Sequence, residues 1–163
     1  MEDMKTRGAY RRLLAELFPD SYESKKVNII HGAPGSGKTT YVQTHKSDDD
    51  LVVDLDYICA ALNATSSLYQ DHGSVLSLAL RLREHIFETI ECREGKWKTA
   101  WVITATPDSH EVQRLATRLR GEVISMDTSR EQCIQNIRSD TRRKGKTDHF
   151  VRLAEDWYTK NCI

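Results

Sequence analysis

The sequence lacks the features of membrane, secreted and zinc-knuckle proteins. No apolar run approaches the ~20 residues of a membrane-spanning helix, and residues 1–7 contain no apolar signal-peptide core. The four cysteines, at positions 59, 92, 133 and 162, are too widely spaced for a zinc knuckle or a Cys-x-x-Cys redox pair. We therefore expect free thiols, a cytoplasmic location and no membrane partner.

The sequence also lacks an excess of charge of one sign. Lys and Arg together number 24, as do Asp and Glu, so the formal net charge is zero. A protein that coats a nucleic-acid duplex is usually basic overall, so this balance argues against that class and permits only local basic patches. The length of 163 residues suits one domain, covering 1–163, with one sizeable core.

What the sequence does contain is a regular alternation of strand and helix patterns. Short apolar, β-branched runs predict strands over 27–30, 51–55, 99–104 and 122–126. Apolar residues at helical spacing predict helices over 9–18, 40–44, 57–63, 74–93, 107–120, 129–143 and 148–160. Such alternation favours an α/β fold of three layers, with a central parallel sheet of four to five strands and helices on both faces.

The most specific motif is Gly-Ala-Pro-Gly-Ser-Gly-Lys-Thr at residues 32–39, between a predicted strand and a predicted helix. This pattern is typical of a phosphate loop, whose backbone N–H groups surround the phosphates of ATP or GTP. We predict that Lys38 reaches the β- and γ-phosphates and takes part in catalysis, and that Thr39 binds Mg²⁺. The residues expected to contact the nucleotide are Gly32, Ala33, Pro34, Gly35, Ser36, Gly37, Lys38, Thr39, Thr40 and Arg143.

Two carboxylates follow the second predicted strand. Asp54 and Asp56 are two residues apart, so on a strand they would face the same side, at the sheet edge where ligands bind in open α/β folds. We predict that Asp54 holds Mg²⁺ through water and that Asp56 orients or deprotonates an acceptor hydroxyl. The alternative is that Asp56 only caps the following helix.

Arginines gather after the fourth predicted strand, in a segment over 128–147 that we call the lid segment. Arg138 and Arg142 are four residues apart and would share one helix face, with Arg143 one step round. We predict that Arg138 and Arg142 stabilise the charge that develops during phosphoryl transfer and that Arg143 contacts the nucleotide. The alternative is a solvated helix face with a basic last turn.

Together these residues resemble small P-loop kinases of the nucleoside-monophosphate-kinase type. The phosphate loop followed by Asp54-x-Asp56 is similar to shikimate kinase, and Asp56-Tyr57 is similar to the zeta-toxin and polynucleotide 5′-kinase group. Residues 126–133 and 155–158 resemble the lid entry and closing helix of phage-type polynucleotide kinases. Two departures stand out: residues 104–107 lack the glycine run of shikimate kinase, and no arginine follows Asp56-Tyr57 to hold an acceptor phosphate.

The resemblance implies a P-loop NTPase fold and a kinase that transfers the γ-phosphoryl group of ATP, with Mg²⁺, to a hydroxyl. A polynucleotide 5′-hydroxyl is the leading acceptor by resemblance, which would make nucleic acid a partner. A small molecule or nucleoside is the first alternative. A nucleotide-hydrolysing ATPase or switch subunit is the alternative of another class. Residues 63–95 are expected to shape the acceptor pocket.

Overall fold

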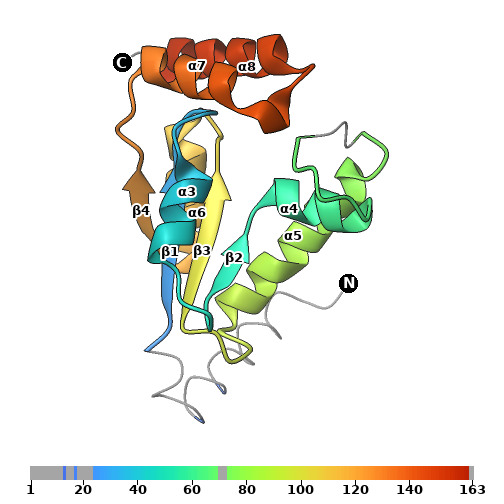
Figure 1. The fold of residues 1–163 in the computed structure, drawn as a ribbon. Helices are drawn as coiled ribbons and strands as arrows, with labels where there is room; N and C mark the ends of the chain where they lie inside the picture. The colour runs from blue at the N-terminus through green and yellow to red at the C-terminus, as the bar shows by residue number, and fades with distance from the viewer. Residues whose placement is uncertain (1–12, 14–16, 18–23, 70–72, 162–163) are drawn as a thin grey trace.

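The computed structural model describes residues 13, 17, 24–69 and 73–161 (Figure 1). The helix expected over 9–18 therefore lies outside the described residues, apart from two positions. The elements, labelled as in Figure 1, are β1 (Lys26–His31), α3 (Lys38–His45), β2 (Leu51–Val53), α4 (Leu55–Leu62), α5 (Leu76–Glu91), β3 (Thr99–Thr104), α6 (Ser109–Leu119), β4 (Glu122–Ser125), α7 (Arg130–Ser139), η1 (Thr141–Arg143) and α8 (Thr147–Asn161). Each helix in this described part is too short or too polar to cross a membrane.

The four strands form one parallel sheet in the order β2-β3-β1-β4. β1 lies between β3 and β4, and the last residue of β1, His31, pairs with Thr104 on one side and with Ser125 on the other. The carboxyl ends of these strands therefore lie at the same edge of the sheet. The expected parallel sheet is confirmed, and its crossovers place the ligand-binding edge where the phosphate loop begins.

Helices cover both faces of the sheet because apolar residues occur on both sides of its central strands. Val27 and Ile29 of β1 contribute to a core with residues of α5 and α6, whereas Ile30 packs on the other face with Val42 of α3. Figure 1 shows α3 and α6 on opposite sides of the sheet. The three-layer arrangement expected from the sequence is confirmed, and it makes the sheet edge a rigid base for the site.

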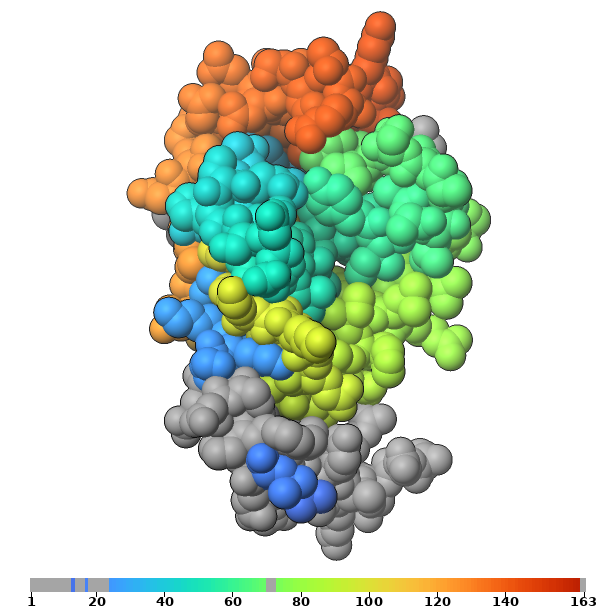
Figure 2. All heavy atoms as spheres, turned by 60° about the horizontal axis from the view of Figure 1, so that its bottom comes forward, coloured from blue at the N-terminus to red at the C-terminus, as the bar shows by residue number. Residues whose placement is uncertain are grey.

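The last two helices lie across the carboxyl ends of the strands. α7 and α8 pack against each other at the top of Figure 1, and the orange part of the surface in Figure 2 extends over the phosphate-loop region. A small apolar cluster of Ala33, Cys133 and Trp157 joins these helices to the phosphate loop. The lid segment is therefore packed directly on the phosphate loop.

The single helix expected over 129–143 is wrong, because the chain breaks at Asp140. α7 ends at Ser139, Asp140 is extended (φ −79°, ψ 102°), and the 3₁₀ helix η1 follows. The Asp140 side chain accepts a hydrogen bond from the Arg142 backbone N–H. Such a bond replaces the helical bond of that N–H to a backbone carbonyl, which is why aspartate is unfavourable inside helices. The break turns Arg142 and Arg143 away from the α7 face that carries Arg138.

Candidate active site

The phosphate loop (residues 32–39) curls between the end of β1 and the start of α3. Gly35 and Gly37 adopt left-handed backbone conformations, with φ of 81° and 87°, which glycine reaches without steric cost. The Ser36 N–H donates to the Ala33 carbonyl oxygen at 3.1 Å, and Gly37 is the N-cap of α3. The positive end of α3 therefore faces the concave side of the loop, as an anion-binding site requires.

Lys38 is buried inside this loop. Its Nζ donates to the carbonyl oxygens of Gly32 and Ala33, both at 2.8 Å. Burial lowers the pKa of Lys38 to about 8, the nearby Asp54 carboxylate partly opposes that shift, and the guanidinium of Arg143 adds to it. Among the described residues, the hydrogen-bond partners of the ammonium group are thus two neutral carbonyls of the loop itself, and it is held where phosphate oxygens would replace them.

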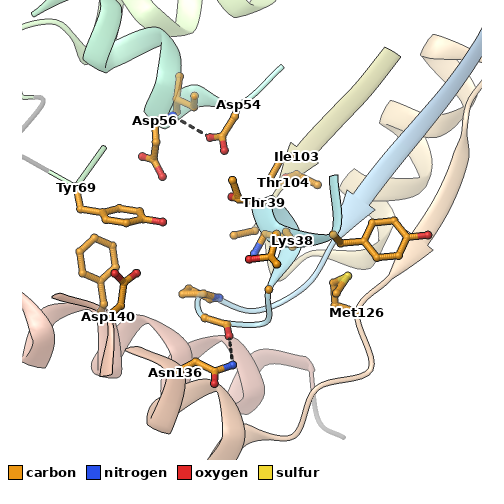
Figure 3. Close-up of a pocket in the computed structure, with 18 of the residues that line it drawn as sticks. Lys38, Thr39, Asp54, Asp56, Tyr69, Ile103, Thr104, Met126, Asn136 and Asp140 are labelled. Atoms are coloured by element: carbon orange, nitrogen blue, oxygen red, sulfur yellow. Dashed lines mark hydrogen bonds between the residues drawn. The ribbon is translucent and has the colours of Figure 1, made fainter. Parts of the chain in front are cut away.

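The lid segment donates two side-chain hydrogen bonds to backbone carbonyls of the phosphate loop. The Asn136 side chain on α7 donates from Nδ2 to the Gly35 carbonyl oxygen at 2.9 Å (Figure 3). The Thr128 hydroxyl donates to the Ser36 carbonyl oxygen at 3.1 Å. Sequence reasoning missed Asn136, because its role depends on a contact between residues 101 positions apart. These bonds fix the loop in the curled form that binds phosphate.

Asp54 and Asp56 both reach the cavity, but not as neighbours on a strand. β2 ends at Val53, Asp54 is the N-cap of α4, and Asp56 lies in the first helical turn. The Asp54 Oδ1 accepts from the Asp56 backbone N–H at 3.0 Å (Figure 3). The expected strand alternation is therefore wrong, and so is the alternative that Asp56 caps the helix, because Asp54 does so.

Asp54 and Thr39 form the part of the site suited to a metal ion. Burial raises the pKa of Asp54, while the Asp56 N–H, the Lys38 ammonium and the Thr39 hydroxyl pull it down. No group of three His, Cys, Asp or Glu residues in the described part of the chain could hold a metal by itself. A hydroxyl beside one carboxylate suits Mg²⁺ instead, which keeps several waters and takes oxygens from nucleotide phosphates.

A cavity of about 980 Å³ opens in front of these residues. The phosphate loop forms its base, the Asp54–Asp56 turn forms one wall, and the lid segment forms the opposite wall (Figure 3). The end of β3 and one residue of α5 complete it. This volume is large enough for a nucleotide and part of an acceptor, because small-molecule sites in proteins run from roughly 300 to 1,000 Å³.

Two of the three expected lid arginines line the cavity. Arg142 forms a bidentate ion pair with Asp140, at 2.8 and 2.9 Å, and this hydrogen bonding holds the pKa of the Asp140 carboxyl below its usual range. Arg143 is buried, and its Nε donates to the same carboxylate at 3.2 Å. Arg138 is exposed on α7, and the structure does not bring it to the cavity wall.

The Arg143 guanidinium is not fully hydrogen-bonded within the described part of the chain. Its Nε contacts Asp140, whereas its Nη1 is buried without a partner among the described residues. Arg143 and Lys38 line the same cavity, so two positive charges border one space. The arrangement therefore fits a polyphosphate.

Arg83 is a cavity residue that sequence reasoning missed. It lies on α5 between the buried residues Ala79 and Phe87, and its guanidinium carbon is 5.5 Å from the Phe87 ring centre. Its Nε is buried without a partner in the described part of the chain. The signal was available: positions 79, 83, 87 and 90 lie on one helix face, so Arg83 interrupts the buried apolar stripe.

The residues after β3 contribute a hydroxyl, and α6 contributes a carboxylate. The Thr106 Oγ1 donates to Glu111 Oε2 at 2.9 Å, and both residues line the cavity. Asp108 lies outward and caps α6, accepting from the backbone N–H groups of His110 and Glu111. The strand end therefore offers polar groups beside Arg83, across the cavity from the lid segment.

Comparisons with known proteins agree with this architecture. The sequence profile of the family described as "AAA domain" (AAA_33) matches residues 27–152. Shikimate kinase from Acinetobacter baumannii, solved in complex with shikimate, superimposes with a TM-score of 0.52 at 16% identity, covering 85% of this chain and 77% of that chain. No curated protein matches the sequence. The expected P-loop NTPase α/β fold is thereby confirmed.

Proposed function

We propose that this chain, which belongs to the AAA_33 family of AAA domains, is an ATP-dependent kinase that transfers the γ-phosphoryl group to a hydroxyl. One observation carries the proposal: a phosphate loop with its lysine, two carboxylates and two lid arginines line a single cavity. A protein that only binds nucleotide does not need an acidic residue on the acceptor side of the phosphates. Phosphoryl transfer to a hydroxyl uses one there.

The nucleotide lies with its phosphates in the loop at residues 32–39 in this proposal. Lys38 exchanges its bonds to two loop carbonyls for bonds to the β- and γ-phosphates, and the Arg143 guanidinium contacts the γ-phosphate from the cavity wall. Thr39 and Asp54, directly and through water, would hold Mg²⁺, which neutralises charge on the phosphate oxygens when bound. These contacts orient the γ-phosphorus toward the Asp54–Asp56 wall.

Asp56 is the proposed general base. Its carboxylate points into the cavity from the first turn of α4, facing the side on which Lys38 lies (Figure 3). An acceptor hydroxyl bound between Asp56 and the γ-phosphate donates its hydrogen bond to the carboxylate, which orients the oxygen for in-line attack and takes the proton. Arg142 and Arg143 stabilise the charge on the transferring group.

Arg83 supports an acceptor that carries an anionic group beside its hydroxyl. It brings a cation to the acceptor side of the cavity. A polynucleotide 5′-end, with a phosphodiester near its 5′-hydroxyl, is the first candidate and agrees with the resemblance of Asp56-Tyr57. An anionic small molecule is the second. Residues 104–107 lack a glycine run, so shikimate itself is not proposed.

The deciding experiment offers γ-labelled ATP together with 5′-hydroxyl DNA, 5′-hydroxyl RNA, nucleosides, or anionic small alcohols. Label in one acceptor class would support the kinase and identify its substrate class. Label only in free phosphate would instead support the nucleotide-hydrolysing alternative.

Asp56→Asn tests the base in the same assay. We expect transfer to fall by about 100-fold or more, the usual contribution of a positioned base, while calorimetry shows unchanged binding of a non-hydrolysable ATP analogue. Asp48→Asn, in the exposed turn before β2, is the matched control and should transfer at the wild-type rate. Full transfer by Asp56→Asn would remove Asp56 from the mechanism.

A further inference from the structure

Arg143 packs against two aromatic rings that come from different parts of the chain and contact each other. The Tyr69 ring centre lies 4.2 Å from its guanidinium carbon and the Phe150 ring centre 4.5 Å. Phe150 belongs to α8, beside the lid segment, whereas Tyr69 belongs to the connection after α4, on the acceptor side of the cavity. The two rings also contact each other, edge to face, with centres 5.3 Å apart. The arginine therefore bridges the two walls.

This contact fixes the orientation of the guanidinium. The Arg143 side chain is 10% exposed, and cation–π contacts are strongest when the cation has lost its water. The two rings restrict movement of the guanidinium, and Asp140 holds it at Nε. Arg143 lines the cavity, so its positive charge borders the space in front of the phosphate loop. The Tyr69 hydroxyl points into the same cavity, in the space between Asp56 and Asp140 in Figure 3.

We propose that Tyr69 is a positioning residue, whose ring, together with that of Phe150, holds the Arg143 guanidinium at the cavity wall beside the γ-phosphate. The inference rests on the proposed function, which places ATP in the phosphate loop. An acceptor bound beside Asp56 also contacts Tyr69, so one residue connects the acceptor wall to the lid segment. Tyr69 forms no bond to the reacting atoms, and its effect passes through Arg143.

The first test separates the ring from the hydroxyl. Tyr69→Phe keeps the aromatic face, and we expect its kcat to stay within about twofold of wild type. Tyr69→Leu removes the face, and we expect kcat to fall about tenfold, which matches the cation–π energies of roughly 1–2 kcal/mol. His85→Leu is the control for loss of an aromatic ring, because His85 is exposed on α5 and does not line the cavity. Equal losses in Tyr69→Phe and Tyr69→Leu would overturn the proposal.

The second test asks whether Tyr69 acts through Arg143. In an Arg143→Met background, Tyr69→Leu should lower kcat no further, because the positioned group is already gone. Two independent, multiplying losses would overturn the proposal. Circular dichroism and thermal melts check that each variant is folded. If Tyr69→Leu proves unstable, Tyr69→Met, which is similar in size and also lacks a ring face, replaces it in both tests.

A binding measurement separates failure of this inference from failure of the kinase proposal. Tyr69→Leu should weaken a non-hydrolysable ATP analogue by about tenfold and leave ADP affinity unchanged, because only the analogue carries a γ-phosphate. If wild type labels no acceptor but this selective loss is seen, the positioning role stands and the kinase proposal fails. If wild type transfers phosphate and Tyr69→Leu weakens neither nucleotide nor kcat, the positioning role is wrong.

Discussion

The burial of Lys38 predicts that raising the pH has opposite effects on folding and on nucleotide binding. In the unfolded chain Lys38 has its ordinary pKa of 10.5, and in the folded chain the pKa is about 8. Between these values the unfolded chain binds more protons than the folded chain, so the free energy of unfolding rises with pH. Binding goes the other way, because the lysine that loses its proton no longer attracts phosphate oxygens.

The pKa values set the size of both effects. The drop from 10.5 to about 8 corresponds to about 3 kcal/mol of cost for burying the charged lysine at neutral pH. About 2 kcal/mol of that cost disappears between pH 7 and pH 9.5, as the folded protein loses the proton and the unfolded chain keeps most of its own. Over the same range nucleotide affinity should fall roughly tenfold for each pH unit above 8.

Lys38→Met isolates these effects from all other titrating groups. Urea unfolding of both proteins at pH 7 and pH 9.5 gives the difference in unfolding free energy between them. We expect wild type to gain about 2 kcal/mol relative to Lys38→Met over this range. Calorimetry of an ATP analogue at pH 8.5, in buffers of different ionisation enthalpy, should detect uptake of about three-quarters of a proton by wild type. An unchanged stability difference, or an affinity that rises with pH, would refute the reasoning.

Three further predictions concern the metal site, the phosphate loop and the helix ends. Asp54→Asn should raise the Mg²⁺ concentration needed for phosphoryl transfer by about tenfold or more, measured by Mg²⁺ titration, with ADP binding in the absence of metal unchanged. Gly35→Ala should lower the unfolding free energy in urea by at least about 1 kcal/mol more than Gly37→Ala, because only its Cβ collides with a backbone oxygen, that of Cys133 at 2.6 Å. Arg93→Met should cost about 3 kcal/mol in the same assay without changing nucleotide affinity, because the guanidinium binds carbonyls at the ends of α5 and α6 and does not line the cavity.

The features that were predictable from the sequence are those set by local chemistry. β3 has the expected bounds, because its apolar run ends at polar residues that close the strand. The phosphate loop is a further case, since its left-handed backbone at Gly35 and Gly37 accepts almost no other residue type. Both features depend on a few consecutive residues, and neither needs information from a distant part of the chain.

The cavity walls were less predictable, because they depend on contacts between distant segments. Asn136 reaches the Gly35 carbonyl, and Tyr69 reaches Arg143, across 101 and 74 positions of sequence respectively, and no local pattern encodes such pairs. Arg83 was an intermediate case. It stands in a buried stripe of α5, which indicates a function for its charge, but the sequence does not tell which cavity that stripe borders.

The lid arginines show how one side chain can invalidate a prediction based on helical spacing. Helical spacing placed Arg138 and Arg142 on one face, and that geometry holds only while the helix continues. Asp140 ends it by accepting the Arg142 backbone N–H, and the same carboxylate then binds the side chains of Arg142 and Arg143. Asp140 therefore has two effects at once. It ends α7, and it binds Arg142 and Arg143 at the cavity wall, while Arg138 stays exposed on α7.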